Sequence, residues 1–171
     1  FSCNDSESEI NLEPSGIWKI IPIEHDGTPI TQVIQELTLT MLMSNKPGFV
    51  GIDSAKVVIG PIPSSLLDLV EVNRFPNNQM FLIMRLEYAG VSLKNFNLES
   101  WEEASSIISQ ILDTLTFAEQ FNYEHRDLNF ENILIKRITK KAQDGINPNN
   151  FIEKSSLEVS IIDHALARGI V

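Results

Sequence analysis

Residues 124–132 read Glu-His-Arg-Asp-Leu-Asn-Phe-Glu-Asn, and the apolar run Ile-Leu-Ile follows at residues 133–135. The stretch contains the pattern H-R-D-L-x-x-x-N, with a carboxylate at Asp127 and a side-chain amide at Asn132. Five specified residues at fixed spacing arise by chance in a chain of this length with a probability of roughly one in ten thousand or less. A charged, solvated loop is the alternative interpretation, and the neighbouring segments argue against it.

The pattern is that of the catalytic loop of protein kinases, in which the Asp orients the attacking hydroxyl and the Asn binds a metal ion. Phosphoryl transfer from ATP depends mostly on positioning and on neutralising the charge of the phosphates. The apolar run at residues 158–162 ends in Asp163, as in the strand before a metal-binding D-F-G element, although here the element reads Asp-His-Ala. We therefore expect Asp127 to be the catalytic carboxylate and Asn132 and Asp163 to bind Mg²⁺.

Two upstream segments complete this pattern. Residues 16–23, Gly-Ile-Trp-Lys-Ile-Ile-Pro-Ile, predict a strand whose lysine, Lys19, pairs with nucleotide phosphates as in V-A-I-K. Residues 29–44 predict a helix that carries Glu36, the expected partner of Lys19, beside an apolar stripe of Ile30, Val33, Ile34, Leu37 and Met41. A strand lysine is often an edge residue, so both assignments depend on the downstream motifs.

The order of these pieces resembles the haspin-type protein kinases, a divergent branch of the eukaryotic kinase superfamily. That family has an E-H-R-D-L loop, a D-Y-T-like element in place of D-F-G, and K-I-I-x-I-E and G-F-I-G-L-N-S segments. The similar segments here are residues 124–128, 163–165, 19–24 and 48–54, and residues 80–90 are similar to the strand that leads into the nucleotide hinge. The resemblance runs from about residue 17 to residue 168.

The resemblance implies ATP and Mg²⁺ as cofactors, with Asp127, Lys19 and Glu36 as the catalytic set. The implied nucleotide-binding residues are Lys19, Glu87, Tyr88, Ala89, Gly90, Ser92, Asn132 and Asp163. At Ser92 the family tends to have an acidic residue for the ribose, so the chain departs from the family at one sugar contact. The family also lacks the Gly after Asp163 and a Lys at position 129, so neither absence argues against activity.

The implied fold class is α+β, a two-lobed protein-kinase-like fold, with residues 1–90 as the small-lobe sheet plus regulatory helix and residues 91–171 as the first part of the large lobe. The chain has 171 residues, fewer than the roughly 250 of a two-lobed kinase. No G-x-G-x-x-G precedes Lys19 and no A-P-E follows Asp163. We therefore expect a fold truncated at both ends and inactive in isolation, with an exposed apolar patch at Ile107, Ile111 and Leu115.

The remaining elements follow from periodicity. Apolar spacing predicts a helix over residues 104–118, and β-branched runs predict strands at residues 57–60 and 81–86. We expect a strand, a turn and a strand within residues 1–24, and a polar connection near residues 73–79. Residues 137–156 are polar with Gly, Pro and Asn, which predicts a hairpin insertion or mobile loop between two strands.

The net charge of −10 argues against direct binding of nucleic acid or an anionic membrane and is compatible with a basic protein or histone-tail substrate. The single cysteine excludes a disulfide framework, and no apolar run is long enough to predict a membrane span. By resemblance we expect a monomeric, nuclear, mitotic serine/threonine kinase acting on a core histone. A catalytically silent pseudokinase scaffold is the alternative; Arg126 argues against a third class, small-molecule phosphotransferases.

Overall fold

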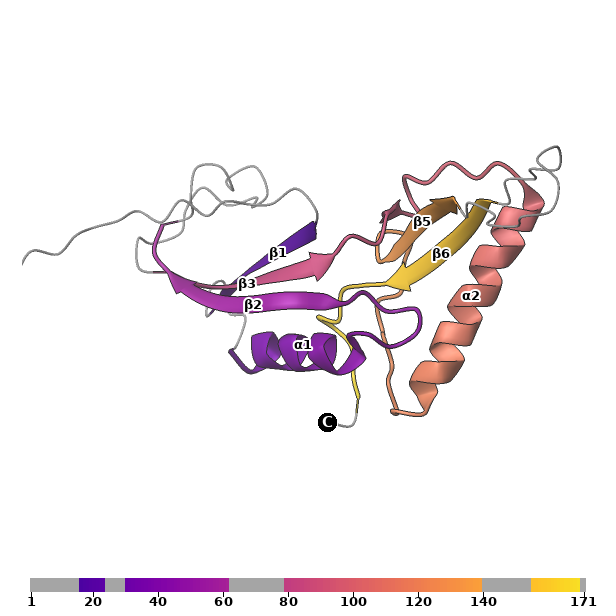
Figure 1. Ribbon diagram of the computed structural model, residues 1–171. Coiled ribbons are helices and arrows are strands. Elements are labelled where there is room, and N and C mark those ends of the chain that lie inside the picture. The colour runs from indigo at the N-terminus through magenta and orange to yellow at the C-terminus, as the bar shows by residue number, and fades with distance from the viewer. Residues whose placement is uncertain (1–15, 24–29, 62–78, 140–154, 170–171) are drawn as a thin grey trace, which may run out of the picture.

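The computed structural model describes residues 16–23, 30–61, 79–139 and 155–169, which form two helices and six strands (Figure 1). In chain order these are β1 (Gly16–Ile23), α1 (Ile30–Met43), β2 (Ile52–Ile59), β3 (Met80–Glu87), β4 (Val91–Ser92), α2 (Trp101–Glu119), β5 (Ile133–Thr139) and β6 (Ser155–Ile161). The α+β class expected from the sequence is confirmed.

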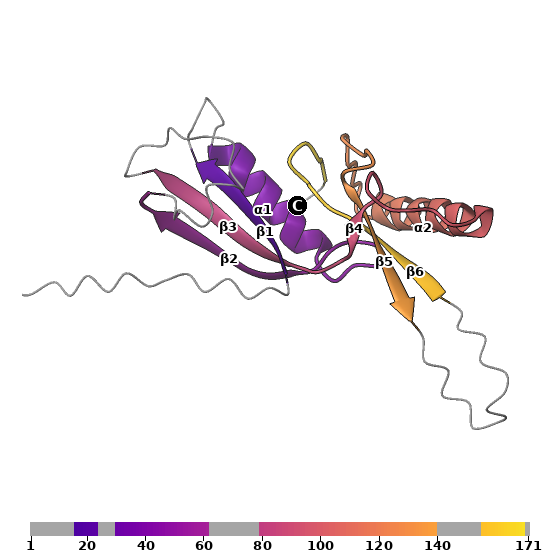
Figure 2. The ribbon, with the colours of Figure 1, turned by 90° about the horizontal axis from the view of Figure 1, so that it is seen from above.

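The strands form two three-stranded antiparallel sheets. The first has the order β1-β3-β2 and the second the order β4-β5-β6. Figure 2 shows α1 beside the first sheet and α2 beside the second. A parallel bridge between Phe49 and Ile161 connects the segment before β2 to the end of β6.

Three apolar clusters form the core of the part of the chain that the structure describes. One lies between α1 and the first sheet and includes Val33, Leu82 and Met84. A second joins α1 to the segments around residues 118–123 and 161–167. The third lies between α2 and the second sheet. Each fully buried aliphatic side chain contributes roughly 1.5–3 kcal/mol, so these clusters hold the segments that carry the site.

The α2 helix begins where its sequence supplies a cap. The Ser100 hydroxyl accepts a hydrogen bond from the Glu103 N–H at 3.2 Å, and the Glu103 carboxylate accepts one from the Glu99 N–H at 2.9 Å. The first bond satisfies an N–H of the first turn that has no helical partner, and the second holds the residue before the cap. Glu102 and Glu103 also place negative charge at the positive end of the helix dipole.

Most of the expected elements are confirmed with small shifts of their ends. The strand expected from residue 57 begins earlier, at Ile52, and the helix expected over residues 104–118 spans Trp101–Glu119. The strands on both sides of the polar 137–156 segment pair with each other, as predicted. The expected structure before residue 16, the connection near residues 73–79 and the interior of the 137–156 segment lie outside the described residues.

The expected apolar patch at Ile107, Ile111 and Leu115 is wrong. Ile107 is buried, and Ile111 and Leu115 are partly buried against apolar clusters, because this face of α2 packs toward the second sheet. The exposed apolar residues of α2 lie on another face: Trp101 is 86% exposed, and Ile108 and Leu112 are each 58% exposed.

The apolar stripe expected on α1 also coincides only in part with the face of the helix that is buried. Val33 is buried, whereas Ile30, Ile34 and Met41 are exposed. The buried face is instead Val33, Glu36, Leu39, Thr40 and Met43. The helix is rotated in this way because Glu36 pairs with Lys19 on β1 and because Leu39 and Met43 pack against the cluster around Phe49.

Among the described residues, no helix combines the length and apolarity that crossing a membrane requires.

Gly48 lies where the turn after α1 passes α2, and its φ is +77°. A Cβ at this position would overlap the side chain of Thr114, approaching Cγ2 to 2.6 Å. We expect Gly48→Ala to lower the free energy of unfolding by about 2–4 kcal/mol, through overlap added to backbone strain. Urea denaturation of the chain would measure the change.

Gly60 provides the matched control, because its φ is +146° and an added Cβ would meet nothing within 4 Å. Gly60→Ala should therefore cost backbone strain alone, of order 1–3 kcal/mol. A Gly48→Ala loss below about 1 kcal/mol would show that α2 does not pack closely on this turn.

Candidate active site

Lys19 lies at the centre of the candidate site. Its Nζ is 2.5 Å from Oε1 of Glu36 and 2.8 Å from Oδ1 of Asp163. The three residues come from β1, from α1 and from the segment that follows β6, so the fold brings together positions up to 144 residues apart. The expected pairing of Lys19 with Glu36 is present in the structure.

The charges of this cluster stabilise one another. Burial alone would lower the pKa of the Lys19 ammonium, but the adjacent carboxylates outweigh it and raise that pKa. Burial raises the pKa of the Glu36 carboxyl, and Lys19 only partly offsets this. Burial would also raise the pKa of Asp163, but the hydrogen bond and charge of Lys19 lower it overall. Lys19 is therefore charged, and Asp163 is an ionised oxygen donor, at neutral pH.

The catalytic loop is folded around Asp127. Asn132, which is buried, donates from Nδ2 to the main-chain carbonyl of Asp127 at 2.9 Å and to its Oδ2 at 3.4 Å. The Asn129 side chain donates to the same carbonyl at 3.1 Å and accepts from the Glu131 N–H at 2.8 Å. Asp127 is itself exposed, so its carboxylate is accessible from solvent.

The donor set fits a magnesium ion. The Nδ2 of Asn132 is used by Asp127, which leaves its amide oxygen available. Oδ1 of Asp163 is held by Lys19 and by the Ala165 N–H, which leaves Oδ2 available. Among the described residues no group of three or more His, Cys, Asp or Glu side chains gathers to hold a metal. Two protein oxygens match Mg²⁺, which usually completes its shell with water and substrate phosphates.

A small pocket opens at the cluster. It is lined by Lys19, Glu36, Thr40, Val50, Met84, Leu86, Ile162, Asp163 and His164. Its apolar walls come from β3 and from the turn before β2, and its charged end is formed by Lys19 with its two carboxylate partners. This combination of apolar surface with convergent charges is typical of a ligand site.

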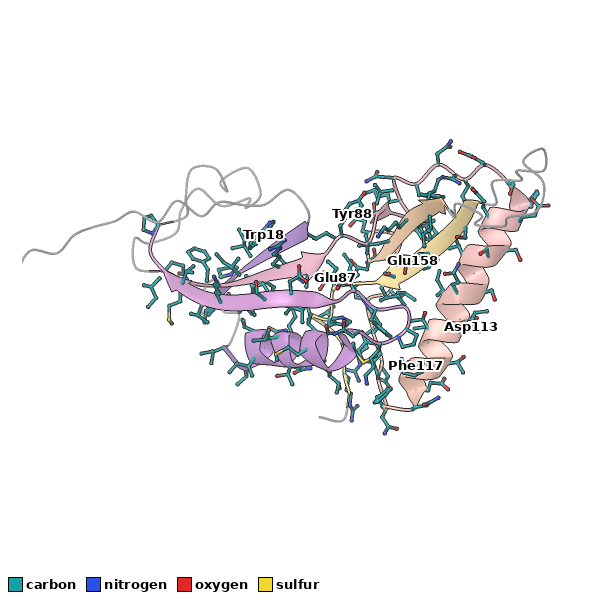
Figure 3. The ribbon with its side chains drawn as sticks, viewed as in Figure 1. Trp18, Glu87, Tyr88, Asp113, Phe117 and Glu158 are labelled. Carbon is teal, nitrogen blue, oxygen red and sulfur yellow. The ribbon has the colours of Figure 1, made fainter. Side chains whose placement is uncertain are left out.

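The expected hinge residues lie where the chain passes from the first sheet to the second, and Figure 3 shows Glu87 and Tyr88 there. The Glu87 N–H donates to the Gly51 carbonyl at 2.9 Å, Tyr88 is exposed, and Gly90 has a φ of +102° beside the Ile135 carbonyl. Ala89 packs against the first core cluster. None of residues 87–92 lines the pocket, so their nucleotide contacts stay predictions.

Ser92 is engaged within its own segment. Its Oγ accepts a hydrogen bond from Nδ2 of Asn95 at 3.2 Å. The hydroxyl keeps its own proton to donate, and a ribose contact at Ser92 also stays a prediction.

Sequence reasoning missed two buried polar residues beside Asp163. Tyr123 and His164 form a hydrogen bond of 2.6 Å between the phenol oxygen and Nδ1. They are 41 residues apart, and a lone tyrosine before the catalytic loop carries no periodic signal. Gln35 was missed as well; its Nε2 donates to the Ala167 carbonyl at 2.9 Å and links α1 to the segment after Asp163.

Burial lowers the pKa of His164 from 6.5 to about 4, His125 and Lys19 act in the same direction, and Asp163 partly opposes them. Below pH 6.5 His164 therefore binds a proton in the unfolded chain but not in the folded chain. Stability rises with pH in this window and is lost as pH falls toward 4. Between about pH 7 and about pH 5 the loss from His164 should be about 2 kcal/mol.

Urea denaturation at the two pH values, without metal, would measure this loss. The raised pKa of Glu36 acts in the opposite direction, so the chain is compared with its His164→Phe variant, in which the His164 contribution is absent. The same pH dependence in both proteins would show that His164 titrates normally in the fold.

These features define the fold of a protein kinase: an antiparallel sheet with a lysine held by a helix carboxylate, beside a loop that presents Asp127 and Asn132. The crystal structure of the yeast RNA Pol II CTD kinase CTDK-1 complex shares this fold, with a TM-score of 0.53 and 20% identity over 90% of this chain and 40% of that chain. The sequence model of the haspin-like kinase domain matches residues 6–170, and the chain belongs to that family.

Curated relatives agree. The serine/threonine-protein kinase haspin of Mus musculus is 31% identical over 160 residues, which are 81% of this chain and 21% of the relative. The haspin homolog of Drosophila melanogaster is 27% identical over 199 residues, 98% of this chain and 35% of the relative. The Schizosaccharomyces pombe homolog is 28% identical, over 75% of this chain and 29% of the relative. The chain thus spans about a third or less of these relatives.

Proposed function

We propose that this chain forms the nucleotide- and metal-binding core of a haspin-type serine/threonine protein kinase, which transfers the γ-phosphoryl group of ATP to a protein hydroxyl. The observation that carries the proposal is the position of Lys19 between Glu36 and Asp163, next to the loop that presents Asp127. If Lys19 and its partners formed only a structural ion pair, the fold would not need an exposed Asp127 carboxylate nearby. It would also not need available oxygens on Asn132 and Asp163.

Each residue has a role that its surroundings support. Lys19, oriented by Glu36, neutralises charge on the α- and β-phosphates. Asp127, whose loop is held by Asn132, orients the substrate hydroxyl and accepts its proton. Asn132 and Asp163 would hold Mg²⁺, which when bound supplies charge neutralisation to the phosphates. Residues 87–90 and Ser92 would contact the adenine and the ribose.

The substrate and setting are proposed from family resemblance and charge. The net charge of −10 favours a basic substrate, and we propose a threonine in a core histone tail, phosphorylated in the nucleus during mitosis by a monomeric kinase. We further propose that residues 1–90 and 91–171 belong to the small and large lobes. The two sheets, which lie on either side of residue 90, support this division.

The decisive experiment measures transfer of radiolabelled phosphate from ATP by the product of the full reading frame that contains this chain. Matched basic peptides carry Thr, Ser, Tyr or Ala at one position. Lys19→Met should lower kcat/KM by at least about 100-fold, because a phosphate-neutralising charge is lost. Lys56→Met is the control, since Lys56 lies exposed on β2 of the same sheet.

Three outcomes separate the classes of protein. Transfer to Thr or Ser that depends on Lys19 and not on Lys56 supports the kinase. Nucleotide binding without transfer in the unaltered protein would identify a pseudokinase scaffold. Transfer to small alcohols in preference to every peptide would place the protein among small-molecule phosphotransferases.

A further inference from the structure

A buried hydrogen bond lies next to Asp163, one of the two residues proposed to bind the metal. The phenol oxygen of Tyr123 is 2.6 Å from Nδ1 of His164, and both side chains are buried. The rings of Phe49, Tyr123 and His125 surround the imidazole, with centroids 5.7–6.0 Å from it. Burial raises the pKa of the Tyr123 phenol, so the phenol keeps its proton and can donate it to Nδ1.

Asp163 has a backbone conformation that its surroundings must maintain. Its φ is +68°, in the left-handed region that residues other than glycine rarely adopt. Such a conformation is unfavourable for a residue other than glycine and persists only where neighbouring contacts determine it. The next residue is His164, so contacts that hold the imidazole also restrict the main chain directly after Asp163.

The other contacts of this segment hold its main chain on either side of His164. Nε2 of His125 is 2.8 Å from the Ile162 carbonyl, and Gln35 donates to the Ala167 carbonyl. Glu124 and Arg168 exchange two main-chain hydrogen bonds. The Ala167 N–H also donates to the His164 carbonyl at 3.1 Å, so these contacts hold the main chain of the segment, while Tyr123 is the hydrogen-bond partner of the His164 ring.

We propose that Tyr123 is a positioning residue: its hydroxyl, through His164, holds Asp163 in the orientation that faces Lys19 and the metal. The proposal extends the proposed kinase function by naming a residue that controls its metal site. If the hydroxyl is removed, Nδ1 of His164 is left buried without a partner, and burying an unpaired polar group is unfavourable. Movement of the imidazole toward water is then favourable, because its Nδ1 can form a hydrogen bond there, and Asp163 moves with it.

The first readout needs neither metal nor activity. The Ala165 N–H donates to Oδ1 of Asp163 at 3.2 Å, so amide hydrogen exchange at Ala165 reports the orientation of the carboxylate. In the 171-residue chain, Tyr123→Phe should accelerate this exchange by about tenfold. The double variant Tyr123→Phe/His164→Phe removes both polar partners and should restore slow exchange.

The second readout is the affinity for Mn²⁺ in the presence of ADP, measured by electron paramagnetic resonance with the full reading-frame product. Tyr123→Phe should weaken it by about tenfold, and the double variant should recover it. Ile107→Val is the control for general loss of stability, because Ile107 lies in the separate cluster between α2 and the second sheet. It should leave both readouts unchanged.

The outcomes distinguish the two proposals. Exchange at Ala165 that is unchanged by Tyr123→Phe, or that Ile107→Val accelerates equally, would overturn the positioning role. An accelerated exchange that the double variant restores supports the role, even if the unaltered protein fails to bind Mn²⁺ with ADP. That failure would instead contradict the proposed function. A weakened Mn²⁺ affinity without recovery in the double variant would also overturn the role.

Discussion

Replacing Asp127 by Asn is expected to lower kcat by about two to four orders of magnitude, because proton transfer to a positioned base contributes that much to the rate. The amide cannot accept the substrate proton, although it nearly preserves the size of the side chain. The main-chain carbonyl of residue 127 still accepts from Asn132 and Asn129, so the loop should keep its fold. ATP affinity should therefore change little.

The measurement is steady-state phosphate transfer with ATP binding determined separately, using the full reading-frame product. Glu131→Gln is the matched control, because it makes the same acid-to-amide change in the same loop at an exposed carboxylate paired with Lys94. That variant should retain kcat within about twofold, as exposed ion pairs contribute little. A kcat close to normal in Asp127→Asn would exclude Asp127 from the mechanism.

Replacing Asp163 by Ala is expected to abolish magnesium-dependent turnover, with a loss of at least about 1000-fold. Two effects combine at this position. The available oxygen that would bind the metal disappears, and Lys19 loses a partner 2.8 Å from its Nζ. Because Lys19 remains paired with Glu36, the fold of the first sheet and α1 should persist.

Turnover is followed over a range of Mg²⁺ concentrations, again with the full reading-frame product. Asp113→Ala provides the control, since Asp113 is an exposed carboxylate on α2 (Figure 3). If turnover survives in Asp163→Ala, the assignment of Asp-His-Ala as the metal-binding element is wrong. If the unaltered protein shows no turnover, the pseudokinase alternative is favoured.

Most of the elements that carry the site could be predicted from the sequence. The strand around Lys19, the helix that carries Glu36 and the loop at Asp127 were expected from local pattern, because apolar period and motif spacing are short-range properties. Their ends differ from expectation by a few residues. The exception is β2, which starts at Ile52 because it pairs with β3 through an irregular register near Ser54.

The buried faces of the two helices were predicted less well than the positions of the elements along the chain. Both helices show broad apolar periodicity, and the sequence alone did not identify which part of the apolar surface would be covered. In α2 the covered part includes Ile107 and leaves Ile108 and Leu112 exposed. In α1 the covered part includes the polar residues Glu36 and Thr40 in place of Ile34. Ion pairing and packing, which are long-range, outweighed local hydrophobicity.

The residue types of the site, their order and the kinase family are evident in the sequence, because Asp127, Asn132 and Asp163 stand in motifs whose spacing is read along the chain. Which of these groups contact one another depends on the three-dimensional fold. It brought Lys19 to Glu36 and Asp163, and it placed Tyr123 against His164. The physical reason is that buried charges and hydrogen-bonding groups require partners, and the fold supplies these partners from segments far apart in the chain.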